Sequence, residues 1–240
     1  MKKIVKVLFI IFILLIIFAG ITFFTQHESK QKLPALEEYT AIVGNNSNGT
    51  VYKIVCGNNS SSDTAVLILG VHSLEGGIHN ATYESILNLT KKNDLNRKFI
   101  VYFIKLNYDD SGLNISDYNT NRHMGEMLAN EFVVPDIENY NPYIVVDIHE
   151  MEDYWEKQEY VGVMDNESAL EVEYAYRIAN NLDYPVLTIN AGSSPEWVTE
   201  PIEKNNHNVI LFETPQKDSP DTKIIIARDL IKIIDNLPIY

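Results

Sequence analysis

Short apolar runs and longer amphipathic segments alternate along most of this 240-residue chain. Several of the runs are apolar almost throughout, as is typical of strands covered on both faces of a sheet. Apolar residues recur at helical spacing over residues 80–93, 168–182 and 221–237, the last with Asp221 as its N-cap. This alternation predicts an α/β fold with a mostly parallel mixed sheet flanked by helices. The predicted strands span residues 50–56, 64–71, 98–106, 142–148, 184–190 and 208–214.

The N-terminal region has a different pattern, an apolar run from Val7 to Phe24 that follows three lysines. Eighteen residues at about 1.5 Å each reach about 27 Å, close to the thickness of the hydrocarbon core of a bilayer. The lysines favour a cytoplasmic N-terminus and place the rest of the chain outside the cell. We predict a single-pass anchor in the cell membrane over residues 1–25, a linker over 26–48 and one globular domain over 49–240. A cleaved signal peptide, which would give a secreted protein, is the alternative.

Composition narrows the classes of partner. Acidic residues outnumber basic ones by 33 to 19, and the formal net charge is −14. Phosphate binding needs clustered Lys and Arg, so we expect no nucleic-acid partner. The only cysteine is Cys56, which leaves no disulfide framework and no cysteine-based zinc site. Numerous Asn-x-Ser/Thr triplets agree with an exterior domain, although an asparagine-rich chain also produces them by chance.

Residue types that bind metals stand where two predicted strands end. His72 and Glu75 follow one apolar run, and His149 follows another. In parallel sheets, loops at the carboxyl ends of neighbouring strands converge on one site. A catalytic zinc commonly has two His and one Glu as protein ligands and an open position for water. We therefore predict that His72, Glu75 and His149 bind Zn²⁺, while a structural role for each histidine is the alternative.

Spacing alone does not identify this site, because His-x-x-Glu occurs three times, including His123 with Glu126. An H-E-x-x-H zinc motif is excluded, since Asp153 stands where its second histidine would be. In the segment after His72, Gly76 and Gly77 would let the backbone turn tightly.

Zinc-dependent hydrolysis also needs a proton acceptor that is not itself a ligand. Glu213 ends a very apolar predicted strand, where burial would raise its pKa toward working pH. We predict Glu213 as the catalytic residue, with a solvent-exposed edge carboxylate as the alternative.

Five short motifs occur in the order found in the zinc carboxypeptidase family, which this chain resembles. They are GVHSLEGG, NTNRH, DIHEM, AGSSPEW and LFETP, and they cover most of residues 64–214. The 74-residue spacing from Glu75 to His149 is nearer to compact relatives, including the succinylglutamate desuccinylase and aspartoacylase branch. The resemblance implies the same three zinc ligands, with Glu213 activating water and then protonating the leaving amine.

The resemblance also implies substrate-binding residues. Asn121 and Arg122 would hold the terminal carboxylate of the substrate, a role that suits the planar guanidinium fork. Ser193, Ser194 and Glu196, in the AGSSPEW loop, would line the side-chain pocket.

Two departures from the family pattern affect the expected chemistry. The family usually has an Asp that bonds the first histidine, whereas this chain has Asn119 there, with Asp117 nearby as a substitute. The family's upstream Arg, which polarises the scissile carbonyl, is also absent, and Lys105 is the available cation.

The leading hypothesis is a membrane-anchored extracellular zinc carboxypeptidase that acts on cell-wall or secreted peptides. One alternative is a deacylase of N-acyl amino acids, and another is a surface binding module that keeps an inefficient zinc site.

Overall fold

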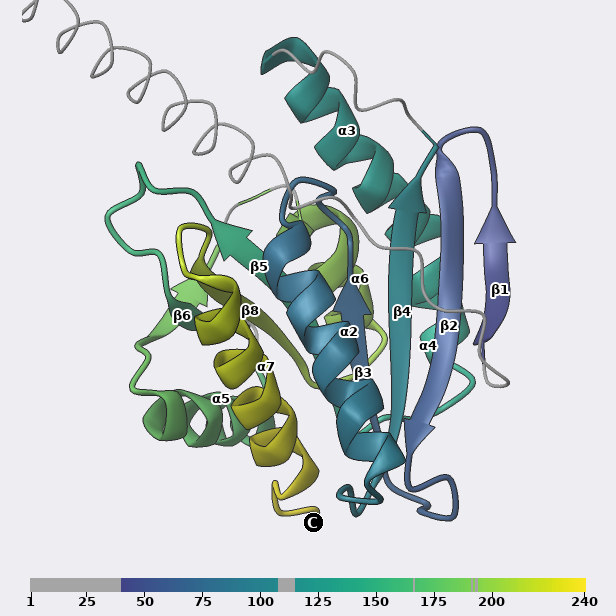
Figure 1. Ribbon diagram of the computed structural model, residues 1–240, viewed down its shortest axis with the longest axis vertical. Helices are drawn as coiled ribbons and strands as arrows, with labels where there is room; N and C mark the ends of the chain where they lie inside the picture. Colours follow the sequence, from purple (N-terminus) through teal and green to yellow (C-terminus); the bar gives the residue numbers. More distant parts are fainter. Residues whose placement is uncertain (1–39, 108–114, 166, 191, 193) are drawn as a thin grey trace, which may run out of the picture. The chain divides into compact units, whose positions relative to one another are not determined.

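The computed structural model describes residues 40–107, 115–165, 167–190, 192 and 194–240. An eight-stranded mixed sheet forms the centre of this part of the chain, in the order β1-β2-β4-β3-β5-β8-β6-β7 (Figure 1). The predicted membrane anchor lies outside the described residues, and no helix within them is long and apolar enough to cross a membrane. The strands are β1 Thr40–Asn45, β2 Gly49–Gly57, β3 Thr64–Leu69, β4 Lys98–Leu106, β5 Ile144–Met151, β6 Tyr160–Met164, β7 Val186–Ile189 and β8 Val209–Pro215.

Parallel pairing joins β4, β3, β5 and β8 at the centre of the sheet, and β6 with β7 at one edge. The pairs β1–β2, β2–β4 and β6–β8 are antiparallel. This arrangement confirms the predicted mixed α/β sheet. The central strands are buried along nearly their whole length, which explains their continuous apolar sequences.

Two strands were not predicted. β1 lies inside the range predicted as a linker, so the sheet begins at Thr40 and not at residue 49. It is an edge strand that leaves Ile42 exposed, so its sequence lacks the apolar run of a central strand. β6 is only five residues long and follows a polar loop.

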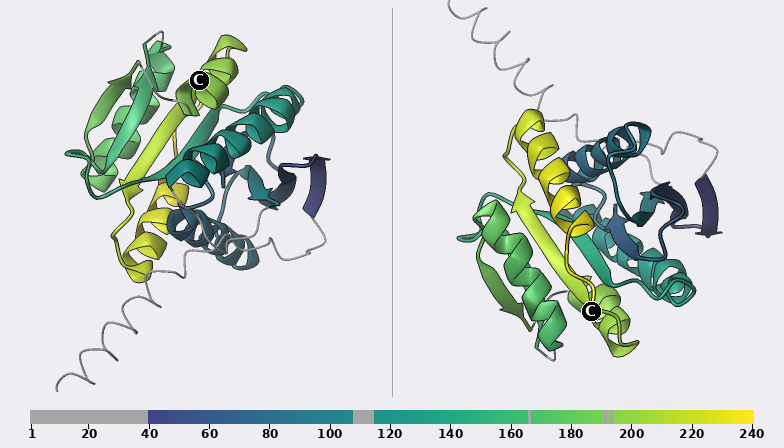
Figure 2. Two further views of the ribbon diagram at one scale, coloured as in Figure 1. Left: turned by 90° about the horizontal axis from the view of Figure 1, so that it is seen from above. Right: turned by 90° about the horizontal axis from the view of Figure 1, so that it is seen from below.

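Helices cover both faces of the sheet (Figure 2). On one face, α2, α5 and α7 pack over a core that includes Leu67, Val146 and Phe212. On the other, α3, α4, α6 and the π-helical segments η1 and η2 pack over a second core, which includes Ile68 and Val145. These elements are α2 Gly76–Lys91, α3 Ile115–Leu128, η1 Ala129–Val133, α4 Val134–Ile137, α5 Ala169–Leu182, η2 Pro195–Thr199, α6 Glu200–Lys204 and α7 Pro220–Asp235.

The N-cap of the last helix lies two residues earlier than predicted. Ser219 is its N-cap, and the Ser219 hydroxyl accepts a hydrogen bond from the Thr222 amide at 3.2 Å. Pro220 occupies the first helical position, where a missing N–H costs nothing. The predicted N-cap, Asp221, therefore lies within the first turn, where its negative charge faces the positive end of the helix dipole.

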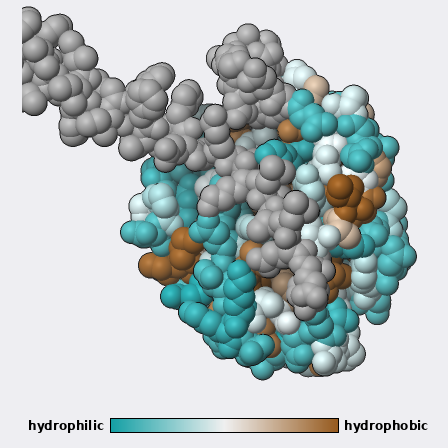
Figure 3. Space-filling view, turned by 45° about the vertical axis from the view of Figure 1, so that its right-hand side comes forward, coloured by the Kyte–Doolittle hydropathy of each residue, from teal (hydrophilic) through white to brown (hydrophobic). Residues whose placement is uncertain are grey.

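The surface drawn in Figure 3 is mostly hydrophilic, with separate small hydrophobic patches. Large hydrophobic side chains that are exposed include Tyr154 and Trp155, in the loop after β5. Most of the apolar residues in the described part of the chain lie instead in the two cores, which hold the strand ends in place for the site described next.

Candidate metal centre

The site begins where β3 ends. Gly70, with φ of +84°, turns the chain out of the strand. The amide of Glu75 then donates to the carbonyl of His72 at 3.1 Å, so that one turn presents both side chains to the same side. Gly76 and Gly77 are the first residues of α2 and not a tight turn, so that part of the prediction was wrong. Gly77 is instead favoured by close packing, because a Cβ at this position would lie 2.6 Å from both Glu150 Oε1 and Lys223 Nζ.

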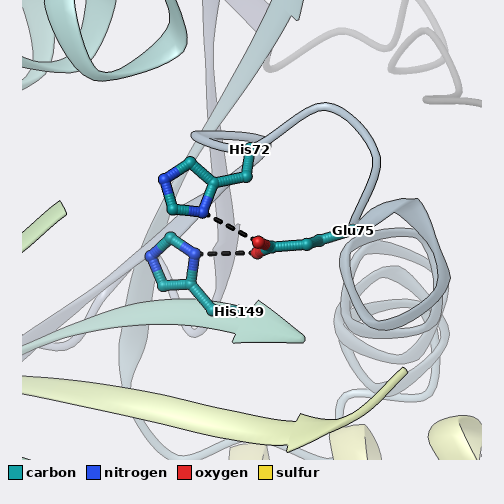
Figure 4. Close-up of side chains that lie close together, drawn as sticks. All are labelled: His72, Glu75 and His149. Carbon is teal, nitrogen blue, oxygen red and sulfur yellow. Dashed lines mark hydrogen bonds and ion pairs between the residues drawn. The ribbon is translucent and has the colours of Figure 1, made fainter. Parts of the chain in front are cut away.

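Three side chains converge at the carboxyl ends of β3 and β5, which are parallel neighbours. Glu75 Oε1 lies 2.8 Å from His72 Nδ1, and Glu75 Oε2 lies 2.8 Å from His149 Nδ1 (Figure 4). The ligand atoms of the three residues all lie within 4.8 Å of one another, and all three side chains are buried. Within the described residues, this is the one cluster of its kind that could hold a metal ion.

Each histidine also contacts a second carboxylate through its other ring nitrogen, Nε2. His72 Nε2 lies 3.0 Å from Glu126 Oε1, and His149 Nε2 lies 3.0 Å from Asp147 Oδ2. A carboxylate at Nε2 holds the proton there and leaves the Nδ1 lone pair free to bind a metal. The donor set is thus two neutral imidazole nitrogens and one carboxylate, which suits zinc.

Glu126 replaces the missing Asp of the family pattern. It lies on α3, while Asn119 is exposed to solvent and the side chain of Asp117 lies outside the described residues. The helix can come this close because residue 125 is glycine: a Cβ there would overlap the carbonyl oxygen of Val71. Gly125 therefore lets Glu126 reach His72, which follows β3.

The register of the sheet places Glu213 beside the metal ligands. His149 on β5 pairs with Glu213 on β8, so the two side chains lie next to each other on the same face. Glu213 is 7% exposed, and its Oε2 has no hydrogen-bond partner within the described residues. Burial, together with the charges of Glu75 and Asp147, raises its pKa to about 8. The predicted rise in pKa is confirmed.

Opposite charges attract the three side chains to one another. Burial acts to raise the pKa of Glu75, but His72 and His149 hold that pKa well below its usual range. Burial acts to lower the pKa of His149, but Asp147 and Glu75 hold it well above its usual range. Metal binding at Nδ1 would require His149 to be neutral there, so it would release any proton held at that atom.

Asn121 and Arg122 lie on α3, close to this cluster. Arg122 Nη1 donates to Glu75 Oε1 at 2.9 Å, and the Arg122 side chain is 27% exposed. Asn121 is buried, and its Nδ2 has no hydrogen-bond partner within the described residues. Both residues are thus positioned at the metal centre, one of them open to solvent and the other with an unused donor.

Among the remaining predicted substrate residues, Ser194 lies at the cluster, with its hydroxyl 3.2 Å from His149 Nε2. Ser194 is buried, and its hydroxyl donates to Asp147 Oδ2 at 2.9 Å. Glu196 is exposed in η2, and Ser193 lies outside the described residues. On β4, Lys105 lies on the same face as Phe99 and Phe103. These two residues belong to the core that α2 and α7 cover. Lys105 is therefore directed to the face of the sheet opposite to His149, and no described contact joins it to the cluster.

Sequence reasoning missed the roles of Glu126 and Asp147. Asp147 stands two residues before His149, so strand alternation alone puts both side chains on one face. Glu126 belongs to the third His-x-x-Glu pair, whose partner His123 lies 3.5 Å from it. The position of Glu126 depends on how α3 packs, and no local pattern predicts that.

No protein-family model and no curated protein matches the sequence. Solved structures do match the fold. A metallo-carboxypeptidase from Pseudomonas aeruginosa, in complex with (2-guanidinoethylmercapto)succinic acid, has a TM-score of 0.55 at 11% identity, over 82% of this chain and 64% of its own. A Shewanella amazonensis protein assigned to the metallopeptidases has a TM-score of 0.53 at 11% identity, over 82% of this chain and 85% of its own.

A third match is the tripeptide-bound cell shape determinant Csd4 from Helicobacter pylori, with a TM-score of 0.52 at 11% identity, over 77% of this chain and 54% of its own. The chain thus spans less than two thirds of the Pseudomonas and Helicobacter proteins. At these identities the likeness concerns the fold, and it confirms the zinc carboxypeptidase-like fold that the five motifs predicted.

Proposed function

We propose that this chain is a zinc-dependent hydrolase that cleaves an amide bond next to a free carboxylate, as a carboxypeptidase acting on cell-wall or secreted peptides. One observation carries the proposal. Two histidines and Glu75 present their metal-binding atoms to one point, and each histidine also contacts a second carboxylate. Glu213 lies beside them, buried and without an ion pair among the described residues.

The residues divide the chemistry among them. Zinc held by His72, Glu75 and His149 would supply a Lewis acid for the carbonyl and lower the pKa of a bound water. Glu213, whose pKa of about 8 lies near working pH, accepts a proton from the attacking water and donates it to the leaving amine. Its burial keeps bulk water from competing for that proton.

Recognition of a free carboxylate is assigned to Arg122 and Asn121. The guanidinium of Arg122 is partly exposed beside Glu75, and a bidentate pair with a carboxylate is a preferred contact of a guanidinium. The unused Nδ2 donor of Asn121 is buried, and such donors normally find a partner. The tripeptide bound to the Helicobacter neighbour and the succinic acid derivative bound to the Pseudomonas neighbour support a peptide or acidic ligand for this fold.

The location outside the cell is part of the same proposal. It is supported by the apolar run from Val7 to Phe24, with lysines on its N-terminal side. A domain anchored at the outer surface of the membrane would meet cell-wall and secreted peptides, whereas N-acyl amino acids are cytoplasmic metabolites.

The test uses the full chain in detergent, loaded with zinc and incubated with a mixed peptide library. Mass spectra would show stepwise loss of C-terminal residues, and Glu213→Gln should reduce the rate by more than about a hundredfold. Glu171→Gln is the matched control, because Glu171 is also buried, with a pKa of about 7, but lies on α5 away from the site. Zinc binding without hydrolysis of any peptide would refute the proposal and favour a surface binding module.

A further inference from the structure

Three strands place a row of side chains across the sheet beside the metal centre. His149 on β5 pairs with Glu213 on β8, and Glu213 pairs in turn with Tyr160 on β6. Directly paired residues of neighbouring strands point to the same face of a sheet. Tyr160 is thus the next side chain in line after the metal ligand and the catalytic glutamate.

The next pair of residues along β6 and β8 shows to which face of the sheet Tyr160 and Glu213 point. Val161 pairs with Phe212, and both are buried in the core under α2, α5 and α7. Alternation along each strand then directs Tyr160 and Glu213 to the opposite face, which also carries His149. The direction of the tyrosine side chain therefore follows from register and not from a flexible loop.

The Tyr160 hydroxyl is an uncommitted donor. The residue is only 8% exposed, and its hydroxyl makes no hydrogen bond within the described part of the chain. Burial, followed by the negative charges of Glu213 and Glu75, raises its pKa above the ordinary tyrosine range, so the phenol stays protonated at any working pH. The hydroxyl itself is not sealed off from solvent, so a ligand can reach it.

Attack on an amide carbonyl moves negative charge onto the carbonyl oxygen, and a donor already aimed at that oxygen lowers the barrier. Two other cations are poorly placed to stabilise this charge, because Arg122 is bonded to Glu75 and Lys105 belongs to the opposite face of the sheet. We propose that Tyr160 donates a hydrogen bond to the scissile carbonyl oxygen and binds the tetrahedral anion more tightly than the substrate. This inference rests on the proposed hydrolase function.

The experiment compares the zinc-loaded full chain with its Tyr160→Phe variant. Calorimetry measures the affinity for a panel of phosphinic dipeptides, whose tetrahedral anion resembles the attacked carbonyl, and for the free amino acids that would be products. Tyr160→Phe should weaken phosphinate binding by roughly 10- to 100-fold and leave amino-acid binding and zinc content unchanged. With a peptide substrate, kcat should fall by a similar factor at nearly constant KM.

Tyr184→Phe is the matched control. The Tyr184 ring stacks on Phe212, which lies on β8 next to Glu213 but on the opposite face of the sheet. The Tyr184 hydroxyl lies 3.4 Å from Thr214 Oγ1. Equal phosphinate affinity in the wild type and both variants would overturn the role of Tyr160. If phosphinate binding depends on Tyr160 but no peptide is cleaved, the donor role stands and the carboxypeptidase proposal fails. A wild-type protein that binds no phosphinate refutes both.

Discussion

Two consecutive residues of β5, His149 and Glu150, face opposite sides of the sheet and have opposite surroundings. Glu150 is buried on the side of α2 and α7, where Oε1 accepts from Lys223 Nζ and from the amide of Ile78, both at 2.5 Å. On the other side lies Glu213, equally buried, with no ion pair in the described part of the chain and with Oε2 unpartnered.

Burial raises both pKa values, that of Glu150 to about 7 and that of Glu213 to about 8. The chain supplies a lysine for Glu150, and that pair holds the start of α2 directly behind Glu75, whose Oε2 also accepts from the Glu150 amide. For Glu213 and the metal ligands the chain supplies no such lysine within the described residues. Lys223 gives Glu150 a structural role, whereas Glu213 lacks such a lysine and lies beside the three metal-ligand candidates, which indicates a site completed by a ligand or metal.

Among the changes that test this contrast between Glu150 and Glu213, Lys223→Met is expected to have the largest effect on stability. Removing one partner of a buried ion pair typically costs about 3–5 kcal/mol. We expect about 3 kcal/mol of unfolding free energy, because Glu150, with a pKa of about 7, can bind a proton and become neutral. Denaturant unfolding of the metal-free full chain measures the loss.

Lys232→Met provides the contrast on the same helix, because its pair with Asp94 is exposed and should contribute less than about 1 kcal/mol. Adding Glu150→Gln to Lys223→Met should recover part of the loss. If the two lysine variants are equally stable, the buried pair does not have the structural role assigned to it.

On the metal side, the next largest effect is expected from Glu126→Gln. An amide holds the Nε2 proton of His72 less strongly than a carboxylate does, and such changes typically lower metal affinity by roughly 10- to 100-fold. Competition with a chelator of known zinc affinity measures it. Glu138→Gln is the control, since Glu138 also lies 3.0 Å from a histidine, His207, but outside the site. Similar zinc affinities for both variants would contradict the support that we assign to Glu126.

Sequence patterns predicted the central sheet because β3, β4, β5 and β8 are buried on both faces and need continuous apolar runs. They did not predict β1, an edge strand with exposed positions, or β6, which has only five residues, and both owe their place to pairing with a neighbour. The three metal-ligand candidates were predictable for a related reason: ligand residue types directly after buried strands serve no packing purpose, and the structure brings them together.

Residues that act through tertiary packing were harder to predict. Glu126 reaches His72 across 54 positions of sequence because Gly125 lets α3 approach the loop. Lys105 was predicted to lie at the site, but its face of the sheet depends on the alternation of β4 relative to β5. Periodicity gives the two faces of each strand, and only the assembled sheet shows which face carries the site.

A further effect, spread over several pH units, concerns the pH dependence of stability. The pKa of Glu213 is raised from an ordinary value of 4.5 to about 8 in the folded protein. Between these values the folded form keeps a proton that the unfolded form has lost, so stability falls as pH rises, by up to about 1.4 kcal/mol per pH unit from this group. Glu213→Gln should flatten the stability profile of the metal-free protein up to about pH 8.

Urea unfolding at several pH values between about 5 and 8 checks this, with Glu171→Gln as the comparison. Since the pKa of Glu171 is raised only to about 7, its variant should run parallel to the wild type above about pH 7. Parallel profiles for wild type and Glu213→Gln over the whole range would show that Glu213 is ionised in the folded protein.

The smallest effect, from Ser194→Ala, separates two roles for one residue. The resemblance places Ser194 in the substrate pocket, whereas its hydroxyl donates to Asp147, which holds His149. Loss of one such hydrogen bond costs about 1 kcal/mol, so zinc affinity should fall about fivefold, with Ser85→Ala, a buried serine on the other face, as control. Unchanged zinc affinity together with a higher KM would instead favour the pocket role, because only a residue in contact with substrate alters binding without altering the metal centre.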